Sequence, residues 1–146
     1  MKKRFGFGLV LLAMSFNLGL SAQSARRNDP FSGAWKLNTI KSTTVVPTPT
    51  AVRIKADNKT ISFSEQEADG GTTTAEAKFD GKDYPVRGSS VADAAAYRRV
   101  GPRTIKSTVK QRGQILLTET MTVSDDGKTL TVGFTQFSGT AVFDKQ

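Results

Sequence analysis

Apolar and polar residues alternate along short stretches of the chain from residue 51 onward, and turn-forming residues separate these stretches. Residues 52–55 and 61–64 are typical, since every second position is apolar and the others are Arg, Lys or Ser. Side chains of a β-strand point to opposite faces in turn, so this alternation predicts strands with one buried face. No stretch keeps the 3.6-residue spacing of an amphipathic helix, which indicates an all-β protein.

About ten strands are expected. They lie at residues 33–38, 52–55, 61–64, 75–79, 82–86, 94–100, 105–110, 114–124, 130–134 and 140–145. Pro47 and Pro49 cannot donate ladder hydrogen bonds, so residues 40–50 are expected to form an extended connection without a helix. Pro85 indicates a sheet edge or a bulge for the same reason. Residues 91–96 contain three consecutive Ala residues, which suit a helix equally well.

Short connections between this many strands favour an antiparallel up-and-down β-barrel of about 8 to 10 strands, or a strongly curved meander. A closed barrel leaves no exposed strand edge. The chain has 18 Thr residues, which suit the half-exposed surface of an antiparallel sheet. It has no Cys, so the core and the strand hydrogen bonds must stabilise the fold without disulfides.

Residues 1–24 have the features of a cleaved Sec signal peptide. Lys2, Lys3 and Arg4 precede an apolar stretch at residues 5–20, and small residues follow at 21–24. A membrane anchor is the competing interpretation, but polar residues interrupt the stretch and it is shorter than a spanning helix requires. We therefore expect a secreted or periplasmic bacterial protein, without a stable membrane anchor after cleavage, whose single domain comprises residues 25–146.

The chain contains neither His nor Cys. This excludes Ser-His-Asp triads, Cys-His nucleophiles, thiolate zinc sites and haem attachment. Glu65 and Glu67 share one face of a predicted strand, but a glycosidase pair normally comes from separate elements across a cleft. We expect no catalytic residues, no metal site and no cofactor, and therefore a protein that is not an enzyme.

Four sequence blocks resemble a family of small secreted bacterial lipocalin-like proteins of the calycin type. They are Phe-Ser-Gly-Ala-Trp-Lys-Leu-Asn at 31–38, Asp-Gly-Lys-Asp-Tyr-Pro-Val at 80–86, Asp-Gly-Lys-Thr-Leu-Thr-Val at 126–132 and the ending Val-Phe-Asp-Lys-Gln at 142–146. The resemblance covers nearly all of the predicted mature domain and implies a fold, not an activity. It further implies that Trp35, after Gly33, closes one end of the barrel. A basic side chain of the last strand would pack on its ring, and Lys145 takes that position where lipocalins usually have Arg.

The odd-numbered residues of the longest predicted strand place one carboxylate among apolar neighbours. The face consists of Ile115, Leu117, Glu119, Met121 and Val123. An unpaired carboxylate is costly inside a barrel, so Glu119 requires a cation, a hydroxyl or water, which Tyr97 or Arg99 could provide. Leu117 and Met121 would then line a cavity in which these polar groups orient a ligand. The alternatives are a bulge that turns Glu119 to solvent, or an ion pair without a ligand.

The leading hypothesis is thus a secreted barrel that binds a small hydrophobic or amphipathic ligand. The alternative is an envelope structural or interaction module with a self-filled barrel, whose basic outer face meets an anionic partner. That face would comprise Arg98, Arg99, Arg103, Lys106, Lys110 and Arg112. Nucleic acid is not an expected partner, because aromatic residues are not interleaved with these charges.

Overall fold

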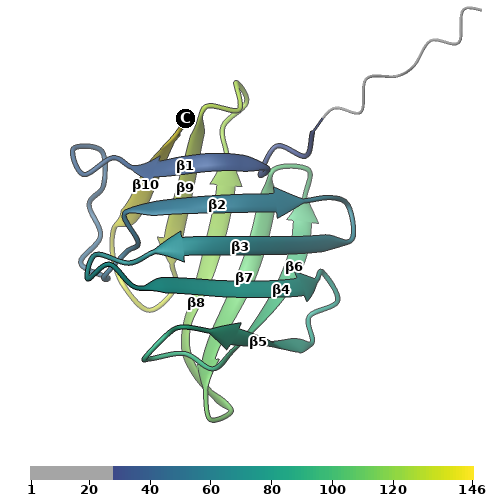
Figure 1. Cartoon of the computed structure of the whole chain (residues 1–146). Helices are drawn as coiled ribbons and strands as arrows, with labels where there is room; N and C mark the ends of the chain where they lie inside the picture. The colour runs from purple at the N-terminus through teal and green to yellow at the C-terminus, as the bar shows by residue number, and fades with distance from the viewer. Residues whose placement is uncertain (1–27) are drawn as a thin grey trace, which may run out of the picture.

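Ten antiparallel strands form one closed barrel in the computed structural model, which describes residues 28–146 (Figure 1). The predicted signal peptide lies outside the described residues. The strands are β1 (Gly33–Leu37), β2 (Ala51–Ala56), β3 (Thr60–Gln66), β4 (Thr72–Lys78), β5 (Asp83–Arg87), β6 (Ala94–Gly101), β7 (Thr104–Gln111), β8 (Gln114–Val123), β9 (Thr129–Phe134) and β10 (Thr140–Lys145). No described residue belongs to a helix long and apolar enough to cross a membrane.

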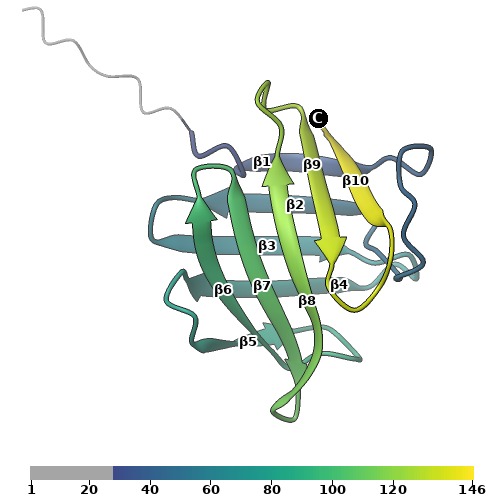
Figure 2. The ribbon, with the colours of Figure 1, turned by 180° about the vertical axis from the view of Figure 1, so that it is seen from behind.

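Every strand pairs with its neighbours in the sequence, and β1 pairs with both β2 and β10 to close the barrel. The predicted up-and-down barrel is therefore confirmed, and the open meander is excluded. Strands β1 to β4 cross the front of Figure 1 at a steep angle to β6 to β9, which come to the front in Figure 2. The three consecutive Ala residues at 94–96 lie in β6, so the helix alternative is wrong.

The ladder is thinnest around β5. Only two residue pairs join β4 to β5, namely Thr74 with Arg87 and Ala75 with Val86. Pro85 lies beyond the end of this ladder and is paired with Ala94 of β6 on its other side. The missing amide hydrogen of Pro85 therefore leaves no gap in the β4–β5 ladder.

A bulge interrupts the pairing of β7 with β8. Leu117 is opposite Val109, but Ile115 is opposite Lys110, so Leu116 is an extra residue on β8. A bulge reverses the face on which the following residues lie. Ile115 is accordingly 59% exposed, and the prediction that it lines the interior with Leu117 is wrong.

The side chains of the hydrophobic core that are most deeply buried gather around Trp35 at one end of the barrel, which we call the closed end. Its most deeply buried large side chains are Phe31, Trp35, Ile105, Val123 and Leu130. Trp35 is 1% exposed, and its indole Nε1 donates a hydrogen bond of 2.9 Å to the carbonyl oxygen of Phe31. This bond satisfies the one polar atom that burial of the ring takes away from water.

Lys145 covers the ring of Trp35, as the lipocalin resemblance implies. The two residues are paired across β1 and β10, and the Lys145 Nζ lies 5.0 Å from the ring centroid, within the range of a cation–π contact. Gly33 makes room for this arrangement, because a Cβ there would lie 2.8 Å from the Lys145 Cε. The Gly33 φ of +144° is also one that other residues rarely adopt.

Candidate functional site

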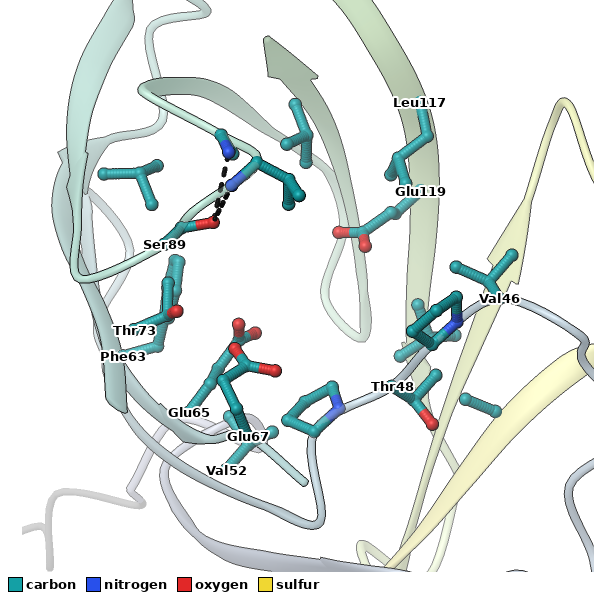
Figure 3. A pocket seen from close by; sticks show the side chains of 18 of the residues that line it. Val46, Thr48, Val52, Phe63, Glu65, Glu67, Thr73, Ser89, Leu117 and Glu119 are labelled. Atoms are coloured by element: carbon teal, nitrogen blue, oxygen red, sulfur yellow. Dashed lines mark hydrogen bonds between the residues drawn. The ribbon is translucent and has the colours of Figure 1, made fainter. Parts of the chain in front are cut away.

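A cavity of about 510 Å³ occupies the barrel between the closed end and the loops opposite it. Its wall is mainly apolar, and Figure 3 shows 18 of the side chains that line it. The apolar contributions from the strands are Val52, Ile54, Ile61, Phe63, Val86, Val109, Leu117, Met121, Leu130, Val132, Phe134, Ala141 and Phe143. A volume of this size is typical of pockets that hold small organic molecules.

Three connections line the mouth of the cavity: residues 46–49 between β1 and β2, residues 67–71 after β3, and residues 88–92 between β5 and β6. The first belongs to the extended connection predicted from Pro47 and Pro49, and it contains no helix. Its side chains Val46 and Thr48 lie beside the opening in Figure 3. These loops therefore border the opening of the cavity.

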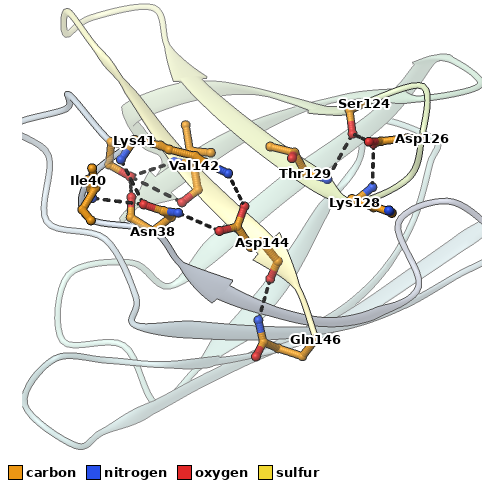
Figure 4. Close-up of polar contacts among 11 residues, drawn as sticks. Asn38, Ile40, Lys41, Ser124, Asp126, Lys128, Thr129, Val142, Asp144 and Gln146 are labelled. Atoms are coloured by element: carbon orange, nitrogen blue, oxygen red, sulfur yellow. Dashed lines mark hydrogen bonds and ion pairs between the residues drawn. The ribbon is translucent and has the colours of Figure 1, made fainter.

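The connection between β1 and β2 is anchored to β10 (Figure 4). Asn38 donates a hydrogen bond of 2.7 Å from its Nδ2 to Asp144, and the Lys41 Nζ lies 2.9 Å from the other oxygen of the same carboxylate. These two contacts, Asn38 first, lower the pKa of Asp144. Ser42 adds a hydrogen bond by accepting from the backbone N–H of Val142 at 2.9 Å. These contacts hold the first part of the connection, residues 38–42, against β10.

Glu119 of β8 points into the cavity, so the alternative in which it faces solvent is wrong (Figure 3). The Ser107 hydroxyl of β7 donates a hydrogen bond of 2.7 Å to the Glu119 Oε2. Burial raises the pKa of Glu119, and the bond from Ser107 opposes this increase only in part. Glu119 is therefore a buried carboxyl with a hydroxyl partner, and it forms no ion pair within residues 28–146.

Glu65 of β3 points into the same cavity from the other side of the barrel (Figure 3). Burial raises the pKa of Glu65 to about 8, and the negative charges of Glu119 and Glu67 contribute further. Glu67 and Asp69 also line the cavity, nearer its mouth. Among residues 28–146, no Lys or Arg lines this cavity, so its four carboxyl groups have no protein cation inside the barrel.

Two buried residues with hydroxyl groups, Tyr97 and Thr73, also line the cavity. Tyr97 of β6 is 4% exposed, and its pKa is raised by burial and by the charges of Glu119 and Glu65. Thr73 is paired with Glu65 across β3 and β4 and is 5% exposed. Within the described part of the chain, the Thr73 Oγ1 has no hydrogen-bond partner. The cavity therefore combines apolar walls with a cluster of polar groups, as most small-molecule sites do.

Arg99 does not belong to this cluster, and the prediction that it lies beside Glu119 is wrong. Its Nη2 is 2.6 Å from the Asp29 Oδ2, at the closed end. Its guanidinium carbon lies 5.5 Å from the ring centroid of Phe31 and 4.8 Å from that of Phe79. Arg99 and Tyr97 do lie on the same face of β6. Two residues along a strand correspond to about 6.6 Å, however, so the two side chains are separated along the strand direction.

The structure therefore brings together four of the five predicted ligand-binding residues. Glu119, Tyr97, Leu117 and Met121 all line the cavity, and Arg99 does not. At the far end of the same strand face, Val123 is 1% exposed and belongs to the closed-end core.

The sequence prediction missed Ser107 and Glu65. Counting back from the turn at Arg112 and Gly113 would have placed Lys106 opposite Glu119, and only the bulge at Leu116 shifts Ser107 into that position. Glu65 carried a usable signal, because it follows Ile61 and Phe63 at every second position.

The basic residues of the alternative hypothesis are partly neutralised by acidic neighbours. Lys110 lies 2.9 Å from Asp83, Arg103 forms an ion pair with Asp125, and Arg99 is bound to Asp29. Half of the six predicted residues thus have a carboxylate partner. This arrangement weakens the case for an anionic partner on this face.

Within residues 28–146, no group of three or more acidic side chains is placed to hold a metal ion. In comparisons with known proteins, the chain matches no protein-family model and no curated protein.

Proposed function

We propose that this protein is a non-enzymatic carrier or receptor that binds one small hydrophobic or amphipathic molecule inside its barrel, without a cofactor. The observation that supports the proposal is the cavity of about 510 Å³ with apolar walls and an internal polar cluster. Apolar walls favour a hydrophobic body, because its transfer from water contributes roughly 25 cal/mol per Å² of buried apolar surface. The polar cluster gives the bound molecule a fixed orientation.

The sequence features fit the same role. The signal peptide predicted at residues 1–24 implies export to the periplasm or the medium. An exported protein of this kind would carry a poorly soluble molecule through water. The lipocalin-like blocks at residues 31–38 and 126–132 imply a barrel fold, and the cavity gives such a barrel room for a ligand. The export of the protein and its resemblance to lipocalin-like proteins are both parts of this proposal.

Filling the cavity tests the proposal directly. The neutral fluorophore N-phenyl-1-naphthylamine becomes bright in apolar surroundings, and we expect the protein to bind it with saturation at one molecule per chain. Leu117→Trp places a large side chain in the cavity and should abolish this binding, while Ile115→Trp adds the same side chain at an exposed position of the same strand. Circular dichroism checks that both variants are folded.

Absence of saturable binding to the unmodified protein would contradict the proposal. The same holds if Leu117→Trp is folded and binds the fluorophore as tightly as Ile115→Trp does, because the binding site would then lie outside the barrel.

A further inference from the structure

We infer that the ligand is a cationic amphiphile, in which a protonated amine is attached to a hydrophobic body and lies between Glu65 and Glu119. This inference rests on the proposed function and specifies its ligand class. Three independent observations support it: the charge of the lining, the placement of the two carboxyl groups, and an unpartnered hydroxyl beside them.

The charge of the lining discriminates between ligand head groups. Glu65, Glu67, Asp69 and Glu119 line the cavity, and no Lys or Arg of the described residues does. An anionic head group, such as that of a fatty acid, would meet four carboxyl groups without any compensating cation. The interior therefore selects against anions, and the acidic residues near the mouth attract cations toward it.

The two deep carboxyl groups are placed to enclose a head group. Glu65 is on β3 and Glu119 is on β8, five strands apart around the ten-stranded ring in either direction. Both side chains nevertheless point into the same space in Figure 3. Because its pKa is about 8, Glu65 holds a proton near neutral pH when no ligand is bound. A nearby ammonium ion favours the charged carboxylate, so binding of the amine would release this proton to water. With its three N–H donors, the ammonium group can then bond to carboxylates on both sides at once. Charge-assisted hydrogen bonds of this kind are stronger than neutral ones.

A neutral head group explains this construction less well. Hydroxyl or amide side chains would bind an alcohol without the large desolvation penalty that buried carboxylates incur. The cluster has hydroxyl groups at Tyr97 and Thr73, and Ser107 donates a hydrogen bond to Glu119, but no Lys or Arg among residues 28–146 lines the cavity beside its two deep carboxyl groups. A ligand cation supplies the missing charge.

Thr73 provides the independent sign that a ligand completes the cluster. Its side chain lines the cavity next to Glu65, and its buried Oγ1 has no partner among residues 28–146. Buried hydroxyl groups in folded proteins nearly always have a hydrogen-bond partner. An amine held by Glu65 would offer the donor that the Thr73 oxygen lacks.

Three probes that share one octyl chain test the inference by isothermal titration calorimetry at pH 7.5. They are n-octylamine, which is protonated, 1-octanol, which is neutral, and octanoate, which is anionic. We expect octylamine to bind at least ten-fold more tightly than octanol, and octanoate to bind most weakly. In Glu65→Gln/Glu119→Gln, octylamine affinity should decrease by ten-fold or more while octanol affinity stays within about three-fold.

Glu76→Gln is the matched control, because Glu76 lies on the exposed face of β4 and outside the cavity. It should bind all three probes like the unmodified protein. Binding of octanol or octanoate as tightly as octylamine would overturn the inference and leave the proposed carrier function standing. An unchanged octylamine affinity in the double variant would also overturn it. If no probe binds, the inference is wrong, and the proposed function is wrong as well when the protein also fails to bind N-phenyl-1-naphthylamine with saturation.

Discussion

Glu65 and Glu119 approach one cavity from opposite sides of a ten-stranded ring, and no basic side chain of the described residues lies in the cavity with them (Figure 3). The strands place both carboxyl groups by the same rule, since each is an inward-facing residue of an alternating strand. A barrel filled only for stability would place apolar side chains here, because buried charges reduce stability unless they are paired. The placement of Glu65 and Glu119 is the reason why we propose that they belong to a binding site.

The first prediction concerns stability and pH. Because the pKa of Glu65 is raised from 4.5 to about 8, the folded protein holds a proton between these values that the unfolded chain releases. The free energy of unfolding should therefore decrease as pH rises from about 5 to 8, and level off above 8. The expected decrease is roughly 3 to 5 kcal/mol, and urea unfolding at each pH measures it.

Glu65→Gln should flatten this pH dependence, because glutamine cannot titrate. Glu119 contributes in the same direction, so a weaker slope is expected to remain. The carboxyl groups with a lowered pKa titrate below this range and do not create the slope; they are Asp57, Asp80, Asp126 and Asp144. Stability that increases from pH 5 to 8 would be inconsistent with a protonated Glu65.

The second prediction separates Arg99 from the ligand site. Arg99→Met leaves Asp29 without its cation and should lower the free energy of unfolding by about 3 kcal/mol. Octylamine affinity should stay within about two-fold, since Arg99 does not line the cavity. Arg98→Met, at the exposed neighbouring position, is the control and should change neither quantity. A ten-fold change in affinity in Arg99→Met would show that Arg99 acts on the ligand after all.

The third prediction concerns the contact between Gly33 and Lys145. Gly33→Ala should lower the free energy of unfolding by about 2 to 3 kcal/mol, because alanine is strained at a φ of +144° and the new Cβ would also displace the Lys145 side chain from the Trp35 ring. Gly70→Ala is the matched control, since Gly70 also has a positive φ, but a Cβ added there would have no atom within 4 Å. It should lower stability by only about 1 kcal/mol. Equal effects would mean that the Lys145 contact has no energetic role.

The fourth prediction concerns the anchored loop at the mouth. Asn38→Ala removes a hydrogen bond to Asp144 and two hydrogen bonds that the Asn38 Oδ1 accepts from the backbone of Ile40 and Lys41. We expect a loosened mouth and a several-fold faster dissociation of N-phenyl-1-naphthylamine in stopped-flow displacement. Lys41→Met, which removes only an exposed ion pair, should have little effect. Identical dissociation rates would show that this loop does not gate the cavity.

The fold could be predicted because its signals are local. Alternation defined the strands, turn residues separated them, and the Gly33, Trp35 and Lys145 positions matched a known type of barrel end. The cavity was only partly predictable. Glu119, Tyr97, Leu117 and Met121 follow from strand parity alone.

The positions of some residues were predicted wrongly or missed because the alternation of inward and outward side chains does not by itself determine them. The bulge at Leu116 exposes Ile115 and brings Ser107 opposite Glu119. No turn-forming residue near Leu116 indicates this bulge in the sequence. Arg99 lies on the same face of β6 as Tyr97, as predicted. It lies nearer the closed end of the barrel, however, where its partner is Asp29, a residue outside the strands. Glu65 faces the interior and lies at the level of the cavity. Its position opposite Glu119 depends on how the ten strands close into a ring, which the sequence of a single strand does not show.

Native mass spectrometry would show whether the barrel holds a small molecule, on which the proposed function depends. The processed protein would be purified without detergent from the organism that makes it, and a portion would be extracted with organic solvent. We expect a one-to-one adduct that disappears on extraction and releases a molecule with a basic amine. Bare protein in repeated preparations, together with no one-to-one complex after addition of N-phenyl-1-naphthylamine, would contradict the carrier function.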